Sequence, residues 1–212
     1  YDSVAPTLTQ TAGPTHMGYW NSATAIFNFT APGATFECNP DGAGYGPCTD
    51  SAGSHTMSGL TEMVHTFAVK ATDAATNFTV LSRTFTVDLT APTVTLTTAT
   101  VAPAYINTNP FTVTATFSEA VTGVDIADFV VTNGTTSNFV AVNPTTYTVD
   151  IIPTADGAIT IDLPASAAQD LATNSNTAAM QIVVNYDGTA PTLTFSVEPP
   201  ALTNDNTFDF TF

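Results

Sequence analysis

Apolar and polar residues alternate along most of this chain, which is the period-two pattern of a β-strand with one buried face. The clearest run covers residues 111–117, where Phe111, Val113, Ala115 and Phe117 share one face and threonines share the other. Two further runs repeat the alternation, through Tyr147, Val149 and Ile151 and through Ile159, Ile161 and Leu163. No stretch has a convincing helical period, and residues 165–170 are expected to form at most one short turn. The pattern predicts an all-β sandwich.

Turn signals separate these runs. Asn133-Gly134 lies between two apolar segments, which predicts a tight hairpin at that point. The sequence Ala-Asp-Gly at 155–157 predicts a second turn.

A six-residue phrase occurs three times, as Asp-Ser-Val-Ala-Pro-Thr at 2–7, Asp-Leu-Thr-Ala-Pro-Thr at 88–93 and Asp-Gly-Thr-Ala-Pro-Thr at 187–192. The copies begin 86 and 99 residues apart, close to the size of an immunoglobulin-like (Ig-like) sandwich of about 100 residues. Proline tolerates the first position of a strand because its missing N–H is not needed there. We therefore interpret the phrase as a linker followed by a first strand.

The repeat divides the chain into a first domain at residues 1–87, a second at 88–187 and the first strands of a third at 188–212. In the third, residues 203–212 resemble residues 108–117, a second strand. Two strands cannot close a core alone. We expect the sequence to be a segment of a longer chain.

Charge narrows the class of partner. Eighteen acidic residues stand against two basic ones, for a formal net charge of −16. Such a surface repels nucleic acid and anionic lipid and attracts divalent cations. Only 9% of residues are charged while 43% are apolar, which argues against an acidic disordered tail. No apolar run of spanning length occurs, so no membrane insertion is expected in this segment.

The second domain resembles the bacterial Ig-like repeats of large surface adhesins. The resemblance rests on Ala91-Pro-Thr, Phe117-Ser-Glu-Ala-Val121, Asp128-Phe-Val-Val-Thr-Asn-Gly134, Tyr147-Thr-Val, residues 155–157, and Asp170-Leu-Ala-Thr-Asn174 followed by Asn176-Thr. One departure is Thr173, where that family usually has glycine.

The first domain resembles a second Ig-like module of extracellular repeat proteins. The matching segments are Phe36-Glu-Cys38, Asp41-Gly42, Pro47-Cys48, Gly59-Leu60, residues 65–73 and Asn77. Thr76 again replaces a glycine. Both resemblances imply scaffold repeats without an active site, although a fold alone does not settle function.

Cys38 and Cys48 are the only cysteines, and glycines and a proline lie between them. This spacing favours a hairpin that brings the two side chains to bonding distance, and a disulfide suits an exported protein. The alternative is a pair of reduced thiols. A zinc site is not favoured, because no further cysteine or histidine pair accompanies them at ligand spacing.

The sequence carries no catalytic constellation. Its three histidines, His16, His55 and His65, show no base–nucleophile spacing, and no nucleophile elbow, phosphate loop or zinc-helix motif occurs. We expect no enzyme activity.

Calcium binding at the domain junctions is a more specific hypothesis than catalysis. In an Ig-like sandwich the preceding linker, the loop after the second strand and the loop before the last strand meet at one end. Those segments contribute Asp88, Glu119, Asp170 and Asn174 in the second domain, Asp2, Asp73 and Asn77 in the first, and Asp187 at the start of the third. Several oxygen ligands from separate loops suit Ca²⁺. The alternative is that Asp73 and Asp170 only cap turns.

Three sequons make Asn28, Asn77 and Asn133 glycosylation candidates. Asn28 should face outward if its neighbours Phe27 and Phe29 face the core. Asn77 cannot be both glycosylated and a side-chain metal ligand.

These features predict a non-catalytic structural segment of a secreted, extracellular or cell-surface adhesin or filament, acting as a rigid spacer or assembly module. Its partners would be neighbouring domains of the same chain, or identical chains in a filament. The alternative is an accessory Ig-like module of a secreted polysaccharide-active enzyme. A carbohydrate-binding module is weaker, because the aromatic pair Tyr19-Trp20 more often belongs to a core or rim.

Overall fold

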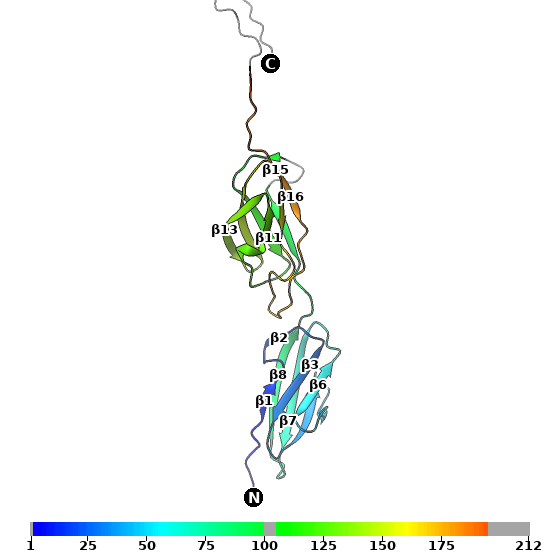
Figure 1. Cartoon of the computed structure of the whole chain (residues 1–212). Helices are drawn as coiled ribbons and strands as arrows, with labels where there is room; N and C mark the ends of the chain where they lie inside the picture. The colour runs from blue at the N-terminus through cyan, green and yellow to red at the C-terminus, as the bar shows by residue number, and fades with distance from the viewer. Residues whose placement is uncertain (1, 100–104, 195–212) are drawn as a thin grey trace, which may run out of the picture.

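The computed structural model describes residues 2–99 and 105–194. These residues form two β-sandwiches joined end to end, with the N-terminus at one end of an elongated molecule (Figure 1). Within the described residues, no strand of the first domain pairs with a strand of the second.

The first domain contains two sheets. One has the order β1-β3-β6 and the other the order β2-β8-β7-β4-β5. Its strands are β1 (Thr9–Ala12), β2 (Gly18–Trp20), β3 (Thr24–Thr30), β4 (Thr35–Pro40), β5 (Gly46–Pro47), β6 (Ser54–Ser58), β7 (Val64–Thr72) and β8 (Phe78–Val87).

The second domain contains two four-stranded sheets, in the orders β13-β14-β11-β9 and β10-β16-β15-β12. Its elements are β9 (Val94–Thr98), β10 (Tyr105–Ile106), β11 (Phe111–Phe117), the 3₁₀ turn η1 (Ile126–Asp128), β12 (Val130–Thr132), β13 (Gly134–Asn143), β14 (Thr146–Pro153), β15 (Gly157–Asp162) and β16 (Ile182–Tyr186).

The predicted alternation along β11 is confirmed. Phe111, Val113, Ala115 and Phe117 are buried, while the threonines between them are not. They pack in one core with the inward residues of β14 and β15, and the Tyr147 hydroxyl donates to the Val121 carbonyl at 3.0 Å. The buried phenol therefore keeps a hydrogen-bond partner, as a core of this kind requires.

Aromatic rings fill the core of the first domain. Phe27 stacks on Phe67 with ring centroids 4.1 Å apart, and Phe85 meets Phe27 edge-on at 5.6 Å. Trp20 packs against the same core and donates its indole N–H to the Thr24 carbonyl at 2.9 Å. Trp20 therefore serves the core rather than a flat exposed platform.

The hairpin prediction at Asn133-Gly134 is wrong. Asn133 adopts φ 54° and joins β12 to β13, which belong to different sheets. The chain turns a corner between the two layers there, because β12 pairs with β15 while β13 pairs with β14. The left-handed backbone that Asn favours is present, but it serves a crossing between layers.

The proposed second strand of a third domain, at 203–212, lies outside the described residues. Only residues 188–194 of the segment 188–212 are described, and they contain no strand. Among the described residues no helix has the length and apolar character needed to cross a membrane.

Candidate functional site

The linker between the domains is fixed at its first three residues. Asp88 N–H donates to the Trp20 carbonyl at 3.0 Å, which continues the parallel pairing of β2 with β8. The Asp88 carboxylate accepts from Thr90 N–H at 3.1 Å. Glu62, from the loop before β7, accepts from Leu89 N–H at 2.9 Å and from the Thr90 hydroxyl at 2.6 Å. The first domain therefore holds the start of the linker on its own surface.

The loop before β16 holds the same linker from the other side. Asp170 and Asn174 close a five-residue turn, in which Asn174 N–H donates to Asp170 Oδ1 at 2.9 Å. The Asn174 side-chain nitrogen donates to Asp170 Oδ2 at 2.9 Å and to the Asp88 carbonyl at 3.0 Å. Asp170 is only 5% exposed. The turn therefore places the buried Asp170 carboxylate next to the linker. The side-chain nitrogen of Asn174 bonds both the carboxylate and the linker.

Three of the predicted ligands meet here. Asp88, Glu119 and Asp170 each offer a carboxylate oxygen, and these atoms lie within 4.8 Å of one another. Glu119 lies two residues after the end of β11, Asp88 comes from the linker, and Asp170 comes from the loop before β16. Carboxylates that converge from three segments form the kind of oxygen cluster that Ca²⁺ binds.

The carboxylates of this cluster disfavour one another's ionised form. Burial raises the pKa of Glu119, and the nearby charges of Asp88, Asp170 and Glu62 raise it further. The two ion pairs within the described part of the chain, His65–Asp41 and Lys70–Glu37, both lie in the first domain away from the cluster. No side-chain cation of the described residues therefore forms an ion pair with these carboxylates.

The first domain repeats the turn with the residues predicted for it. Asn77 N–H donates to Asp73 Oδ1 at 2.9 Å, and the Asn77 side-chain nitrogen donates to Asp73 Oδ2 at 3.0 Å and to the Asp2 carbonyl at 3.2 Å. These hydrogen bonds lower the pKa of Asp73, with the Asn77 side chain as the largest cause. Asp73 therefore caps its turn, as Asp170 does.

No third carboxylate joins Asp2 and Asp73 among the described residues. The loop after β3 reads Ala-Pro-Gly-Ala at 31–34, so this end has no counterpart of Glu119. The Asp2 carboxylate accepts from Val4 N–H at 3.0 Å and shapes its own linker. The two junctions, for which the sequence analysis predicted the same kind of site, therefore differ in structure: the described residues bring three carboxylates together only at the junction of Asp88.

Asp187 also shapes a linker, because its carboxylate accepts from Thr189 N–H at 3.1 Å. Asp156, a residue not singled out from the sequence, accepts from Gly188 N–H at 2.7 Å and from the Thr189 hydroxyl. These bonds lower the pKa of Asp156, chiefly through Thr189. Asp156 does for the following linker what Glu62 does for the first.

The signal for Glu62 and Asp156 was in the repeated phrase itself. Thr90 and Thr189 occupy its third position, and each hydroxyl donates to one of these carboxylates. A second contact that sequence reasoning missed crosses the junction directly. The Asn21 side-chain nitrogen donates to the Thr173 hydroxyl at 3.1 Å.

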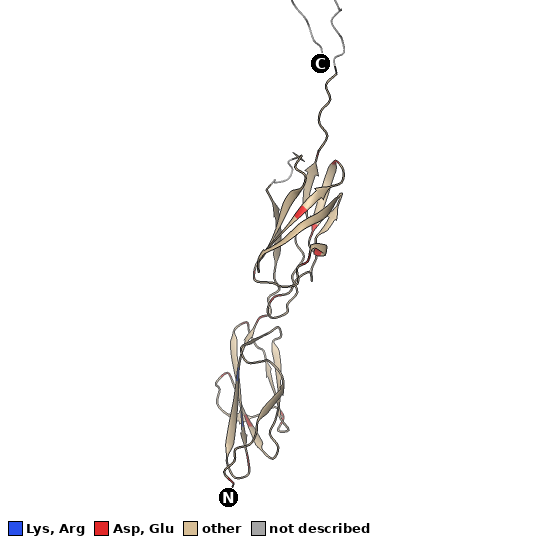
Figure 2. Cartoon of the chain, turned by 90° about the vertical axis from the view of Figure 1, so that its left-hand side faces the viewer, with Lys and Arg blue, Asp and Glu red and all other residues tan. Residues whose placement is uncertain are grey.

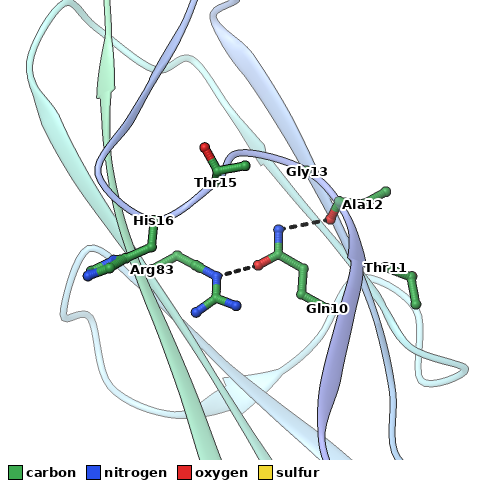
Figure 3. Close-up of a pocket in the computed structure, with 7 residues that line it drawn as sticks. All are labelled: Gln10, Thr11, Ala12, Gly13, Thr15, His16 and Arg83. Atoms are coloured by element: carbon green, nitrogen blue, oxygen red, sulfur yellow. Dashed lines mark hydrogen bonds between the residues drawn. The ribbon is translucent and has the colours of Figure 1, made fainter.

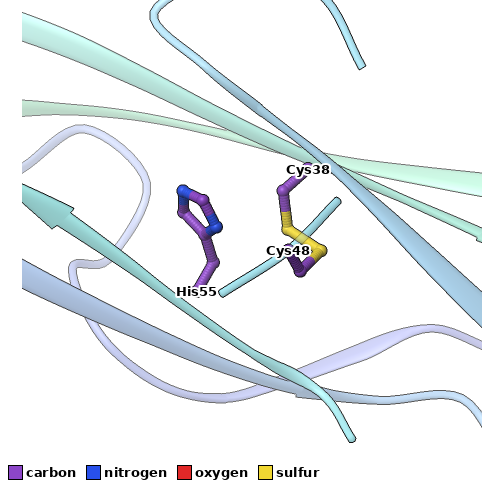
Figure 4. Close-up of side chains that lie close together, drawn as sticks. All are labelled: Cys38, Cys48 and His55. Carbon is purple, nitrogen blue, oxygen red and sulfur yellow. A yellow bond between two sulfur atoms is a disulfide. The ribbon is translucent and has the colours of Figure 1, made fainter. Parts of the chain in front are cut away.

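The disulfide prediction is confirmed. Cys38 and Cys48 are bonded, with an S–S distance of 2.07 Å, across the β4–β5 hairpin (Figure 4). His55 lies beside them, so that the three side chains place possible ligand atoms within 4.8 Å. The sequence did not indicate this neighbour. Because metal sites need cysteine thiolates, the bonded sulfurs do not make this cluster a zinc site.

The histidines have separate partners. His65 is buried between Asp41, 2.8 Å from its Nδ1, and the Thr61 carbonyl, 2.9 Å from its Nε2. Burial opposes the charged imidazole, but the hydrogen bonds to Asp41 and Thr61 and the charge of Asp41 outweigh it and raise the pKa of His65. His55 Nδ1 accepts from Thr49 N–H at 3.2 Å, and burial lowers the pKa of His55. His55 Nδ1 also lies 3.3 Å from the Thr49 hydroxyl.

An open pocket lies between β1, the loop after it and β8 (Figure 3). Arg83 projects into it, and the Arg83 Nε donates to Gln10 Oε1 at 2.6 Å. The Gln10 side-chain nitrogen is held in turn by the carbonyls of Ala12 and Pro14, at 3.1 and 3.0 Å. Since β1 and β8 belong to different sheets, this chain of bonds ties the two layers together at their edge.

The sequons differ in their surroundings. Asn28 is exposed between buried Phe27 and Phe29, as expected. The Asn133 side-chain nitrogen donates to the Ala155 carbonyl at 2.9 Å, and that of Asn77 serves the turn described above. Among the residues that the structure describes, Asn28 is the one sequon asparagine whose side chain makes no such bond.

The comparisons with known proteins agree with this fold. A family model described as a bacterial Ig-like domain matches residues 88–186. A search of curated proteins gives no significant match.

Several solved structures are similar at low identity. The fibronectin(III)-like modules of Clostridium thermocellum CbhA are 18% identical with a TM-score of 0.45, over 85% of this chain and 95% of that one. A 1.5-MDa bacterial ice-binding adhesin is 14% identical with a TM-score of 0.43, over 89% of this chain and 67% of that one.

A third similar structure is SGBP-B from the mixed-linkage glucan utilization locus of Bacteroides ovatus. It is 16% identical with a TM-score of 0.34, over 86% of this chain and 48% of that one. Identities this low concern the fold alone. The family model and the paired sheets identify residues 88–186 as a bacterial Ig-like domain within an all-β tandem of sandwiches.

Proposed function

We propose that this chain is a non-catalytic spacer segment of an extracellular, repeat-built surface protein. Its work is mechanical: the linker at 88–93 sets the angle between two sandwiches, and Ca²⁺ bound by Asp88, Glu119 and Asp170 stiffens that angle. The disulfide supports an oxidising, extracellular setting. The acidic surface supports a protein that avoids nucleic acid and anionic membranes; in Figure 2 acidic positions far outnumber basic ones, 18 to two in the sequence.

The convergence of the three carboxylates carries this proposal. Like charges held within 4.8 Å of one another repel, and partial burial strengthens the repulsion at Glu119. A divalent cation would convert that repulsion into attraction and would connect the linker to two loops of the second domain. Because the first domain already holds the linker through Glu62, fixing Asp88 also fixes the two domains relative to each other.

The N-terminal end of the first domain offers fewer ligands for a cation than the internal junction does. Asp2, Asp73 and Asn77 supply two carboxylates and an amide, and the nitrogen of that amide is already committed to the turn. We therefore propose one principal calcium site, at the internal junction, and none of equal strength at Asp2.

Calcium titration followed by calorimetry tests the proposal. The wild-type chain should bind one Ca²⁺ and reject Mg²⁺ at equal concentration, because Mg²⁺ demands a stricter octahedron. At a calcium concentration about 100 times Kd, binding should stabilise the second domain by about 2.7 kcal/mol. That raises its Tm by roughly 10 °C or more for a domain of this size.

Matched variants separate a built site from general attraction of cations. Asp88→Asn should abolish the binding heat, whereas Asp187→Asn should leave it unchanged. The two aspartates shape their linkers in the same way, but of the two only Asp88 belongs to a cluster of three carboxylates among the described residues. Equal loss in both variants, or heat that persists in Asp88→Asn, would refute the site.

A further inference from the structure

Two threonines adopt a backbone conformation that β-branched residues avoid. Thr76 and Thr173 both have φ 70°, in the left-handed region where a Cβ clashes with the chain and glycine is favoured. Strain of this kind persists where another interaction requires the side chain. Each threonine is exposed, so packing in a core does not explain it.

The two threonines occupy the same position of the same turn. Thr76 N–H donates to the Asp73 carbonyl at 3.1 Å, and Thr173 N–H donates to the Asp170 carbonyl at 3.2 Å. Asn77 and Asn174 then bind the linker carbonyls of Asp2 and Asp88, at 3.2 and 3.0 Å. The two domains therefore present one constellation at the end where the chain enters.

In the second domain that constellation is in contact with a neighbour. Asn21, in the loop between β2 and β3, donates from its side-chain nitrogen to the Thr173 hydroxyl at 3.1 Å. Glycine at Thr173 could adopt the backbone without strain but could not accept this hydrogen bond. The contact gives the strained threonine a role that glycine lacks.

The second domain also has an asparagine in the position that Asn21, the hydrogen-bond donor, occupies in the first. Asn21 follows β2, which pairs parallel with β8, and Asp88 N–H donates to the Trp20 carbonyl at 3.0 Å. Asn107 follows β10, which pairs parallel with β16, and Asp187 N–H donates to the Ile106 carbonyl at 2.9 Å. Asn21 and Asn107 thus hold equivalent places at the end where each domain's chain leaves, and Asn107 is exposed.

We propose that asparagine and strained threonine form a repeating latch between successive Ig-like domains. Asn21 and Thr173 are the closed copy. Thr76 is an open acceptor, and the surface around it, made by Asp2, Asp73 and Asn77, is a docking surface for another Ig-like domain. The partner must present an asparagine in the position of Asn107. This inference rests on the proposed spacer function.

One difference marks the limit of the equivalence. Val4 stands in the linker position that Thr90 and Thr189 occupy elsewhere. A carboxylate of the docking domain that is equivalent to Glu62 or Asp156 therefore finds no hydroxyl at this position of the linker. At the open end the contact has to come from the latch and from backbone groups.

The closed latch is tested first, in the chain as it exists. Spin labels on one exposed strand residue in each domain report the distribution of interdomain distances. Asn21→Ala and Thr173→Val should each broaden it, with about fivefold more of the misaligned conformers, the effect of losing one net hydrogen bond. Thr173→Gly should broaden it equally while raising the Tm of the second domain by about 4 °C, because strain is relieved.

Thr76→Gly is the matched control. It should raise the Tm of the first domain in the same way and leave the distance distribution unchanged, because no partner contacts Thr76 within the described chain. If Thr173→Gly leaves the distribution as narrow as in the wild type, the latch is wrong. A wild-type distribution that is already broad in calcium would instead contradict the spacer function itself.

The open acceptor is tested in a tandem of two copies, joined from Tyr186 of the leading copy to Asp2 of the trailing copy. Residues 1–186 contain every strand that the structure describes in the two sandwiches. With labels flanking the new junction, Asn107→Ala in the leading copy and Thr76→Gly in the trailing copy should each broaden the distances. Unchanged distances in both variants would overturn the docking surface and leave the closed latch standing.

Discussion

The side-chain nitrogen of Asn174 lies 3.0 Å from the backbone carbonyl of Asp88, a residue 86 positions earlier in the chain. The same nitrogen lies 2.9 Å from Asp170 Oδ2. One amide group therefore joins the linker to the turn that carries the buried carboxylate. This amide therefore helps to hold Asp170 and Asp88 in place, two of the three candidate calcium ligands.

Replacing that amide should weaken the second domain. Asn174→Ala removes two hydrogen bonds and leaves the Asp170 carboxylate, 5% exposed, with one fewer donor. We expect a loss of about 1–3 kcal/mol in the free energy of unfolding, the cost of unsatisfying a buried polar group. Chemical denaturation followed by fluorescence measures it. Asn77→Ala is the companion variant; if only Asn174→Ala weakened its own domain, the equivalence of the two turns would be wrong.

The effect of Glu119 on the stability of the second domain should change sign when calcium is added. Its pKa is raised above the ordinary 4.5 by burial and by its acidic neighbours. The unfolded chain therefore loses its proton first as pH rises, and stability falls between about pH 4.5 and the raised pKa, then stays lower. Glu119→Gln removes this penalty.

Without calcium, in EDTA at pH 7, Glu119→Gln should melt at a higher temperature than the wild type. In millimolar calcium the order should reverse, because the variant loses a ligand. Calorimetric scans in both buffers provide the measurement. A variant that melts lower in both would show that Glu119 stabilises the fold by other means.

The first domain should carry a histidine-dependent pH profile. The pKa of His65 is raised by Asp41 and by the Thr61 carbonyl despite burial. A raised pKa means that the folded state favours the protonated imidazole. Its stabilising effect is complete below about pH 6.5 and is lost as pH rises through the folded pKa.

Asp41→Asn isolates that effect. An asparagine keeps an oxygen for Thr66 N–H, which Asp41 Oδ1 accepts at 2.7 Å, but removes the charge that faces His65. Thermal melts between pH 5 and 9 can be followed by the fluorescence of Trp20, which packs against the core of the first domain. The Tm should fall with rising pH for the wild type and should change less for Asp41→Asn. Parallel profiles for the two proteins would contradict the assignment.

The sequence predicted strands well where alternation was uninterrupted. Along β11 every second residue is buried, because a strand with one solvent face has no other way to hide its apolar side chains. Asn133-Gly134 misled for a related reason. The dipeptide fixes a left-handed backbone locally, but whether the next strand pairs beside the last or in the opposite layer depends on long-range pairing.

The carboxylate cluster was predictable because it follows from topology. A linker, the loop after the second strand and the loop before the last one meet at one end of a sandwich, so Asp88, Glu119 and Asp170 could be grouped from their places in the repeat. The contact of Asn21 with Thr173 was not predictable in the same way. Asn21 belongs to the preceding domain, and its contact depends on how the two domains are placed, which strand periodicity does not encode.

Small-angle X-ray scattering of residues 1–212 in millimolar calcium and in EDTA tests the central claim most directly. The account predicts an extended particle with a narrow distribution of interdomain distances in calcium, and a shorter mean extension with a broader distribution in EDTA. Asp88→Asn should match the EDTA state in both buffers, while Asp187→Asn should follow the wild type. Identical scattering of the wild type in both buffers would contradict a calcium-stiffened spacer.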